Sequence, residues 1–174
     1  MDHQGALLQL PVAELTRRAG QISWILLDVD GVLTDGRLYY GPTGEIIKAF
    51  HVKDGYGVRL ARQAGIKVGS LSSRADAAFA RRAADLAFDL VMEGARDKST
   101  AFEGFLAGKG IAPEAVAYAG DDLPDLPVLS RVGLALCPAD AAPEVRQAAH
   151  VVLAKNGGQG AVRELVELLL GWRG

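Results

Sequence analysis

Short apolar segments alternate along this chain with longer segments in which apolar residues recur every three or four positions. The short segments are typical of buried strands in a parallel sheet, and the longer ones of the helices that cover such a sheet. We predict strands at residues 22–29, 67–71, 90–92, 115–119, 133–136 and 151–153. We predict helices at residues 55–63, 75–86, 99–107, 141–148 and 161–170, with residues 11–18 as a candidate leading helix. The alternation predicts an α/β fold, a Rossmann-like doubly wound parallel sheet.

One segment breaks this alternation. Residues 37–40 and 45–50 have the composition of strands, and the turn-forming residues 41–44 join them. We predict a β-hairpin that projects from the domain, and the alternative is a hairpin folded back onto it. The 174 residues suit a single domain over positions 1–174, because a second full domain has no room.

Composition narrows the class of protein. The chain has 19 basic and 21 acidic residues, which argues against a dedicated nucleic-acid binder with its usual basic stripe. Cys137 is the only cysteine, so the chain forms no internal disulfide, and we read Cys137 as a small buried apolar residue. The first nine residues lack the features of a secretory signal, and no apolar run approaches the roughly 20 residues of a membrane span. We expect a cytoplasmic protein with no nucleic-acid and no membrane partner.

Two carboxylates follow the first predicted strand. Asp28 and Asp30 stand two residues apart at a buried strand end, where they are costly to desolvate unless a cation or donors compensate them. The alternative for such a stretch is a turn in which Asp side chains cap backbone amides. An EF-hand loop is excluded, because Val32 and Leu33 occupy positions where that loop needs an oxygen ligand and a glycine.

Three further polar clusters follow later strands, and the carboxyl ends of strands are where open α/β sheets bind ligands. They are Ser72 with Ser73 and Arg74, then Lys98, then Asp121 with Asp122 and Asp125. A hydroxyl beside a helix start can orient a phosphate, and clustered acids favour a hard divalent cation. Each cluster alone also fits a structural role: a helix N-cap, a solvated lysine and a capped loop.

Taken in order, these four clusters resemble the motifs of the haloacid dehalogenase superfamily of phosphatases, which run Asp-x-Asp-Gly, Ser or Thr, Lys, and Gly-Asp-Asp-x-x-Asp. The resemblance is closer to one branch, the 3-deoxy-D-manno-octulosonate 8-phosphate phosphatases, in residues 30–36, 52–57 and 157–164. That branch usually has Thr-Gly-Arg where this chain has Ser72, Ser73 and Arg74. Serine keeps the hydroxyl, whereas Ser73 adds a side chain to the loop beside the phosphate.

The resemblance implies a Mg²⁺-dependent phosphatase with an aspartyl-phosphate intermediate. Asp28 would be the nucleophile and Asp30 the general acid and base. Asp28, the backbone carbonyl of Asp30, and Asp121 would hold Mg²⁺. Ser72 and Lys98 would bind the phosphate oxygens.

The resemblance also implies supporting roles. Asp122 and Asp125 would position Asp121 and metal-bound water, and Lys98 would pair with Asp28 or Asp122. These are the residues that we expect around the reacting groups.

Neither gap between the motifs has room for a cap domain of the kind that many relatives carry. The resemblance implies that another subunit completes the site, in a homotetramer assembled through the hairpins. Leu38, Tyr39 and Tyr40 fit this expectation, because they put apolar surface on a projecting hairpin.

The sequence indicates the substrate less directly than it indicates the reaction. Arg74 and Arg82 are the best placed cations for a sugar-acid carboxylate, and both also fit solvated helix positions. In the branch that acts on nine-carbon sugar acids a glutamate tends to stand where Arg74 does, so Arg74 favours the eight-carbon 8-phosphate.

Two other classes remain as alternatives. One is a non-catalytic oligomerisation module, against which the full set of reacting groups argues. The other is a phosphate-accepting receiver domain, which carries its acceptor Asp on a later strand than that of Asp28.

Overall fold

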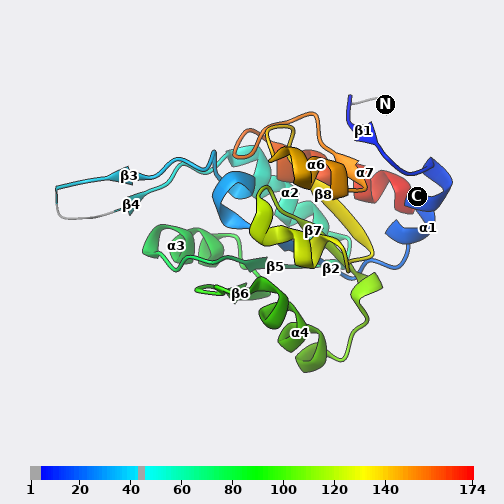
Figure 1. Cartoon of the computed structure of the whole chain (residues 1–174), viewed down its shortest axis with the longest axis horizontal. Coiled ribbons are helices and arrows are strands. Elements are labelled where there is room, and N and C mark those ends of the chain that lie inside the picture. The colour runs from blue at the N-terminus through cyan, green and yellow to red at the C-terminus, as the bar shows by residue number, and fades with distance from the viewer. Residues whose placement is uncertain (1–4, 43–45) are drawn as a thin grey trace.

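The computed structural model describes residues 5–42 and 46–174, and within these ranges seven strands form one sheet in the order β1-β9-β8-β7-β2-β5-β6 (Figure 1). The strands are β1 (Leu7–Leu8), β2 (Trp24–Leu27), β5 (Lys67–Leu71), β6 (Leu90–Met92), β7 (Val116–Ala119), β8 (Leu134–Cys137) and β9 (Val151–Val152). Strand β1 runs antiparallel to β9 at one edge, and all other neighbours are parallel. The predicted α/β class is confirmed.

Helices cover both faces of this sheet. They are α1 (Val12–Ala19), α2 (Val52–Gln63), α3 (Ala77–Asp85), α4 (Lys98–Lys109), α5 (Leu126–Leu129), α6 (Pro143–Ala148) and α7 (Ala161–Arg173). Apolar residues of α1, α2, α3 and α7 pack in one core cluster, and those of α4, α5 and α6 in the other. Strand β2 contributes to both, because successive side chains point to opposite faces: Ile25 to the first cluster and Leu26 to the second. The sheet is therefore doubly wound, as predicted.

Strands β5 and β6 have the predicted bounds. Several other elements begin or end at residues different from those predicted. Helix α2 begins at Val52 instead of residue 55, because the Nδ1 atom of His51 accepts the N–H of Lys53 at 3.2 Å and caps the helix there. Strand β1 and helix α5 were not predicted, since two and four residues are too short for a periodic signal. None of the described helices is long and apolar enough to cross a membrane.

The predicted hairpin is present and projects from the molecule (Figure 1). Strands β3 (Tyr39–Tyr40) and β4 (Ile46–Ile47) pair antiparallel, with Tyr39 opposite Ile47. The side chains of Tyr39, Tyr40 and Ile47 are at least half exposed. Residues 43–45, which include part of the predicted turn, lie outside the described residues. Within the described ranges no separate domain covers the sheet.

The sheet order brings the predicted clusters together. Strand β2 lies between β5 and β7, and all three are parallel, so their carboxyl ends meet at one edge. The chain leaves β2 at Asp28, β5 at Ser72 and β7 just before Asp121. This adjacency in space is the reason that motifs far apart in sequence form one site.

Candidate active site

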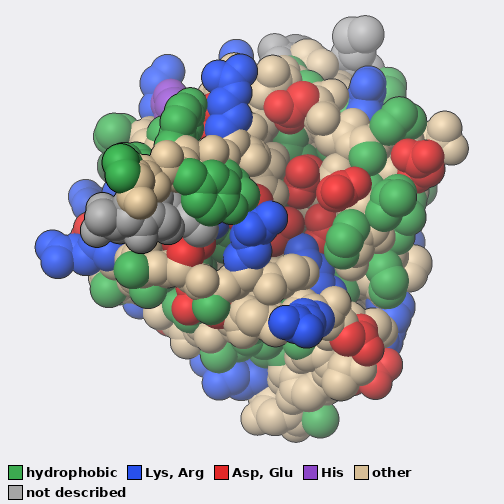
Figure 2. Space-filling view, turned by 60° about the vertical axis from the view of Figure 1, so that its left-hand side comes forward, with side chains coloured by type: hydrophobic (Ala, Val, Ile, Leu, Met, Phe, Trp, Pro, Cys, Tyr) green, Lys and Arg blue, Asp and Glu red, His purple; other side chains and the backbone are tan. Residues whose placement is uncertain are grey.

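A pocket of about 340 Å³ opens at this edge. Its lining consists of Asp28, Asp30, Gly36, Ser72, Ser73, Arg74, Lys98, Asp121, Asp122, Pro124 and Asp125. Figure 2 shows acidic side chains gathered in a hollow of the surface, with Lys or Arg side chains beside them. All the predicted site residues except Arg82 therefore reach one cavity.

The loop after β2 shapes the floor of the pocket. Asp28 is buried, and its Oδ1 accepts the N–H of Val29 at 2.7 Å. The chain then turns at Gly31, whose φ of +84° favours glycine. A Cβ atom at Gly31 would lie 2.0 Å from the Oδ2 of Asp121, so the glycine also makes room for that carboxylate. The predicted carboxylates of two separate motifs meet at this turn.

A second loop, near the end of the sequence, supports the turn from behind. The N–H of Gly158 donates to the carbonyl of Val32 at 3.0 Å, and the N–H of Gly157 donates to Asp140. A Cβ atom at Gly157 would lie 1.8 Å from the carbonyl oxygen of Gly31. The backbone of residues 157–158 therefore packs directly on the loop that carries Asp28.

Lys98 is the cation at the centre of the pocket. It is the first residue of α4 and is only 4% exposed. Its Nζ lies 3.0 Å from the Oδ2 of Asp28 and 2.6 Å from the Oδ1 of Asp125. The solvated surface lysine that was the structural alternative is wrong, because burial without these partners would be costly. Of the two predicted partners, Asp28 or Asp122, the structure shows Asp28, and Asp125 is a further partner that was not predicted.

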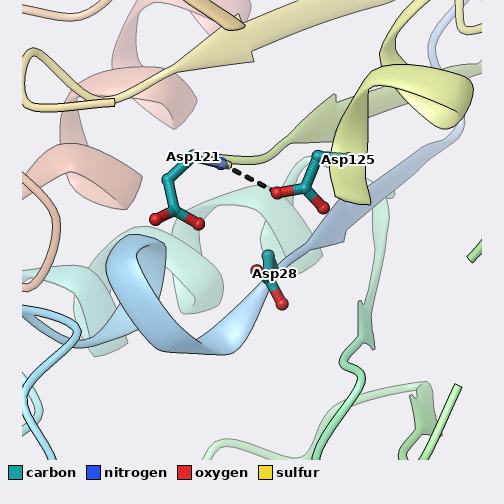
Figure 3. Close-up of side chains that lie close together, drawn as sticks. All are labelled: Asp28, Asp121 and Asp125. Atoms are coloured by element: carbon teal, nitrogen blue, oxygen red, sulfur yellow. Dashed lines mark hydrogen bonds between the residues drawn. The ribbon is translucent and has the colours of Figure 1, made fainter. Parts of the chain in front are cut away.

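Asp125 organises the loop that carries Asp121. Its Oδ1 also accepts the hydroxyl of the buried Tyr118 at 2.5 Å, and its Oδ2 accepts the N–H groups of Asp121 and Asp122. Figure 3 shows Asp121 and Asp125 pointing towards Asp28, with the bond from the Asp121 amide drawn. Both oxygens of Asp125 are thus engaged, whereas the Oδ1 of Asp122 caps the N–H of Leu123 at the rim.

Three carboxylates repel one another in the pocket: the buried Asp28 and Asp125 and the partly buried Asp121. Oxygen atoms of Asp28, Asp121 and Asp125 lie within 4.8 Å of one another. Burial, then the charges of Asp28 and Asp125, raises the pKa of Asp121 to about 8. Burial and Asp125 raise the pKa of Asp28 to about 6, while Lys98 opposes the shift. A hard divalent cation would compensate this charge, and the oxygen donors of Asp28 and Asp121 fit Mg²⁺.

Polar residues that follow β5 also line the pocket: Ser72, Ser73 and Arg74. Ser72 is buried, and its Oγ accepts the N–H of Arg74 at 3.2 Å, so the hydroxyl hydrogen is free to donate into the pocket. The alternative of Ser72 as an N-cap is wrong, because Asp76 caps α3 by accepting the N–H of Phe79 at 2.8 Å. The guanidinium of Arg74 is half exposed, with Nε 3.6 Å from the Oδ2 of Asp30.

Arg82 is not brought into the pocket. Its guanidinium lies over the ring of Phe50, 5.9 Å from the centroid, and donates to the carbonyl of His51 at 3.4 Å. It reaches that place because residues 73–76 are not helical and α3 begins only at Ala77. A substrate contact of Arg82 stays a prediction.

Sequence reasoning missed three residues next to the site: Lys48, Asp76 and Tyr118. Lys48 is buried and pairs with Asp30 at 2.7 Å and with Asp76 at 2.5 Å. Burial lowers the pKa of Lys48 and the two carboxylates raise it, and the carboxylates prevail. The sequence held little signal for these contacts, since Tyr118 lies in an apolar strand and Lys48 follows an apolar pair of residues.

Comparison with known proteins places the chain among the family that its motifs resemble. The sequence profile of the haloacid dehalogenase-like hydrolases matches residues 76–165. The 3-deoxy-D-manno-octulosonate 8-phosphate phosphatase of Escherichia coli strain K12 is 44% identical over 158 residues, which cover 91% of this chain and 84% of that protein.

Solved structures with the same fold include phosphatases of the same name. The phosphatase of the same name from Yersinia pestis has a TM-score of 0.89 and 41% identity, over 92% of this chain and 86% of that one. The corresponding enzyme from Moraxella catarrhalis, in complex with a magnesium ion, a phosphate ion and a KDO molecule, has a TM-score of 0.89 and 36% identity, with 92% of each chain covered.

Proposed function

Since this chain belongs to the haloacid dehalogenase-like hydrolases and is a phosphatase, we propose that it hydrolyses 3-deoxy-D-manno-octulosonate 8-phosphate through an aspartyl-phosphate on Asp28. The observation that carries the proposal is the position of Asp28. It is a buried carboxylate at the end of strand β2, between β7 and β5, paired with Lys98 and close to Asp121 in the pocket.

In the first step an oxygen of Asp28 attacks phosphorus, and the bond from phosphorus to the sugar oxygen breaks. Asp30 lines the same pocket two residues further on and gives a proton to the leaving sugar oxygen. The products of this step are the free sugar acid and a phosphorylated Asp28.

In the second step the carboxylate of Asp30 takes a proton from water as the water oxygen attacks phosphorus. The bond from phosphorus to Asp28 breaks, which releases inorganic phosphate and restores both carboxyl groups. A single residue thus serves as acid and then as base, so Asp30 has to face the same point in both steps.

The remaining groups hold the charge of the phosphate. Lys98 and the hydroxyl of Ser72 donate to its oxygens, and Asp125 and Asp122 keep the Asp121 loop in place. The carboxylates of Asp28 and Asp121 and the carbonyl of Asp30 would hold Mg²⁺, whose charge lets an anionic nucleophile approach an anionic phosphate. The named Mg²⁺ complex of the Moraxella enzyme supports this cofactor.

The choice of substrate rests on the relatives and on Arg74. Their names state the eight-carbon 8-phosphate, and Arg74 stands at the rim with a guanidinium suited to a carboxylate. Arg82 stays a weaker candidate because it packs on Phe50.

We also propose the homotetramer, formed through the hairpin. Its support is the exposed apolar surface of Tyr39, Tyr40 and Ile47 on β3 and β4. Sedimentation at micromolar concentration tests it, and a monomer there would contradict it. The cytoplasmic location remains an expectation from the single cysteine.

The decisive experiment is phosphate release from a panel of sugar phosphates, with and without Mg²⁺. We expect fastest release from the eight-carbon 8-phosphate, strict dependence on Mg²⁺, and no turnover by Asp28→Asn with its fold retained. Faster release from a nine-carbon 9-phosphate would change the substrate. A folded protein that releases phosphate from none would favour the oligomerisation module.

A further inference from the structure

Lys48 stands out because it is charged, buried and outside the motifs discussed so far. It directly follows β4, at the base of the hairpin, and its side chain has 0% exposure. Its Nζ lies 2.7 Å from the Oδ1 of Asp30 and 2.5 Å from the Oδ2 of Asp76. A buried ammonium is tolerated only with such partners, so the three residues form one ion cluster around the buried Lys48.

The two carboxylate oxygens of Asp30 have different surroundings. The Oδ1 atom is buried and pairs with Lys48 by charge, without hydrogen-bond geometry, whereas the side chain as a whole is 23% exposed and lines the pocket. The Oδ2 atom lies 3.6 Å from the Nε of Arg74, a side chain that is 54% exposed. Lys48 therefore holds one oxygen of Asp30 from behind and leaves the other on the pocket side.

The orientation of the Asp30 carboxylate depends on its side-chain contacts, because the loop around Asp30 is not regular helix or strand. The next residue, Gly31, has the freest backbone of any residue type, and Asp30 itself lies in a non-helical kink of the loop. An aspartate side chain has several rotamers, and proton transfer requires the one that places the carboxylate within hydrogen-bond reach of the reacting oxygen.

Asp76 fixes Lys48 in turn. Its Oδ1 accepts the N–H of Phe79 and caps α3, and its Oδ2 faces the ammonium. The position of Lys48 is thereby tied to the start of a helix, at the far end of the same ion cluster.

From this geometry we propose that Lys48 is a positioning residue for Asp30: it fixes the Oδ1 atom so that the Oδ2 atom faces the leaving oxygen and then the attacking water. Lys48 does not touch the substrate, since its side chain is buried. The inference rests on the proposed acid and base role of Asp30. A purely structural Lys48, which only neutralises Asp76 and anchors the hairpin, is the competing account.

The test compares Lys48→Met with Asp30→Asn and with the double variant, in the presence of Mg²⁺. On the sugar phosphate, Lys48→Met should lower kcat roughly 100-fold with little change in KM, because proton transfer contributes about 10²–10⁴-fold. In the Asp30→Asn background the same substitution should cost almost nothing further, since the group it positions is already lost. Lys53→Met, at an exposed lysine of α2, is the matched control and should retain the wild-type rate.

A second substrate separates positioning from general damage. In p-nitrophenyl phosphate the leaving group needs no proton, so the single-turnover release of nitrophenolate by Lys48→Met should stay near the wild-type rate. An equal loss on both substrates, or additive losses in the double variant, would show a structural role and overturn the inference.

Lys48→Met removes the cation that lies between Asp30 and Asp76 and can fail to fold, so Asp76→Asn provides a second route. The amide oxygen still caps α3, but the ammonium loses its anchor. We expect about a tenfold loss of kcat on the sugar phosphate, with nitrophenolate release unchanged. An unchanged kcat would overturn the inference. Wild-type protein that hydrolyses no sugar phosphate would instead contradict the proposed function, and this inference would fall with it.

Discussion

The Nζ atom of Lys98 lies 3.0 Å from the Oδ2 atom of Asp28. This contact joins the start of α4 to the end of β2, and it places a buried positive charge beside the carboxylate proposed to attack phosphorus. The ammonium offsets the repulsion among the acidic side chains, and in the proposed function it also binds the phosphate of the substrate.

Replacing Lys98 with methionine should harm both activity and stability. We expect kcat to fall by roughly 10²–10³-fold, as for the loss of one donor to a developing anion. The free energy of unfolding without Mg²⁺ should fall by about 3 kcal/mol, because Asp28 and Asp125 would be buried without their cation. Steady-state kinetics and denaturant unfolding measure these effects. Lys109→Met, at the exposed end of the same helix, is the control, and equal behaviour of the two variants would contradict the assigned role.

Asp121→Asn should stabilise the protein in the absence of metal while abolishing its response to Mg²⁺. Burial and the charges of Asp28 and Asp125 raise the pKa of Asp121 to about 8, so a neutral amide relieves unfavourable charge. We expect a higher melting temperature for the metal-free variant. Added Mg²⁺ should raise the melting temperature of the wild type only, because a ligand that binds the folded state stabilises it.

Asp85→Asn, which alters an exposed carboxylate of α3, serves as the control for that experiment and should respond to Mg²⁺ like the wild type. If added Mg²⁺ leaves the melting temperature of the wild type unchanged, Asp121 is not part of a metal site.

Gly157→Ala should destabilise the protein and reduce its activity. The new Cβ would collide with the carbonyl of Gly31, which has to move together with the loop that carries Asp28. Overpacking of this kind costs about 1–3 kcal/mol. Gly171→Ala is the matched control: it lies within α7 with nothing near its added Cβ, and should stabilise the fold by about 0.5–1 kcal/mol. Equal melting temperatures for the two variants would refute the packing argument.

His150 should make stability depend on pH. Its Nδ1 accepts the N–H of Ala135 in β8 at 3.0 Å, which requires the neutral ring. Burial, then the charge of Arg18, lowers the pKa of His150 below 6.5, and Glu14 opposes this shift. The folded state therefore binds fewer protons than the unfolded state, and this contribution to stability is present above pH 6.5 and lost as the pH falls.

His150→Asn tests this linkage, because an amide oxygen can accept the same N–H without titrating. Urea unfolding at about pH 5 and about pH 8 should show a pH-dependent loss in the wild type that is smaller in the variant by about 1 kcal/mol, the value of one hydrogen bond. Identical pH dependence in the two proteins would assign the effect to other groups.

The strands that position the site were predictable because each is a short apolar run bounded by polar residues. Parallel neighbours then bring Asp28, Ser72 and Asp121 to one edge, and this step needs only the general geometry of α/β sheets. The roles of Asp30, Lys98 and Asp125 were predictable only through the resemblance of the four motifs, in their order, to the haloacid dehalogenase superfamily.

The contacts that could not be predicted join segments whose meeting depends on loop paths. Lys48 and Asp76 are ordinary surface residues in sequence and become neighbours only because the hairpin base lies against the start of α3. Arg82 shows the opposite case: its spacing from Arg74 suggested a shared face, but the irregular residues 73–76 turned it onto Phe50. Local periodicity carries no information about such turns.

The packing of residues 157–158 on the nucleophile loop has a consequence for synthesis. A ribosome makes Asp28 well before residues 157–158, whose backbone supports its loop, and before the start of α7, where the N–H of Arg163 donates to Asp54. A nascent chain that stops short of these residues holds all four motifs without the support of their first loop. Competence for catalysis therefore requires residues 157–163 to be made and to dock on the loop that follows β2.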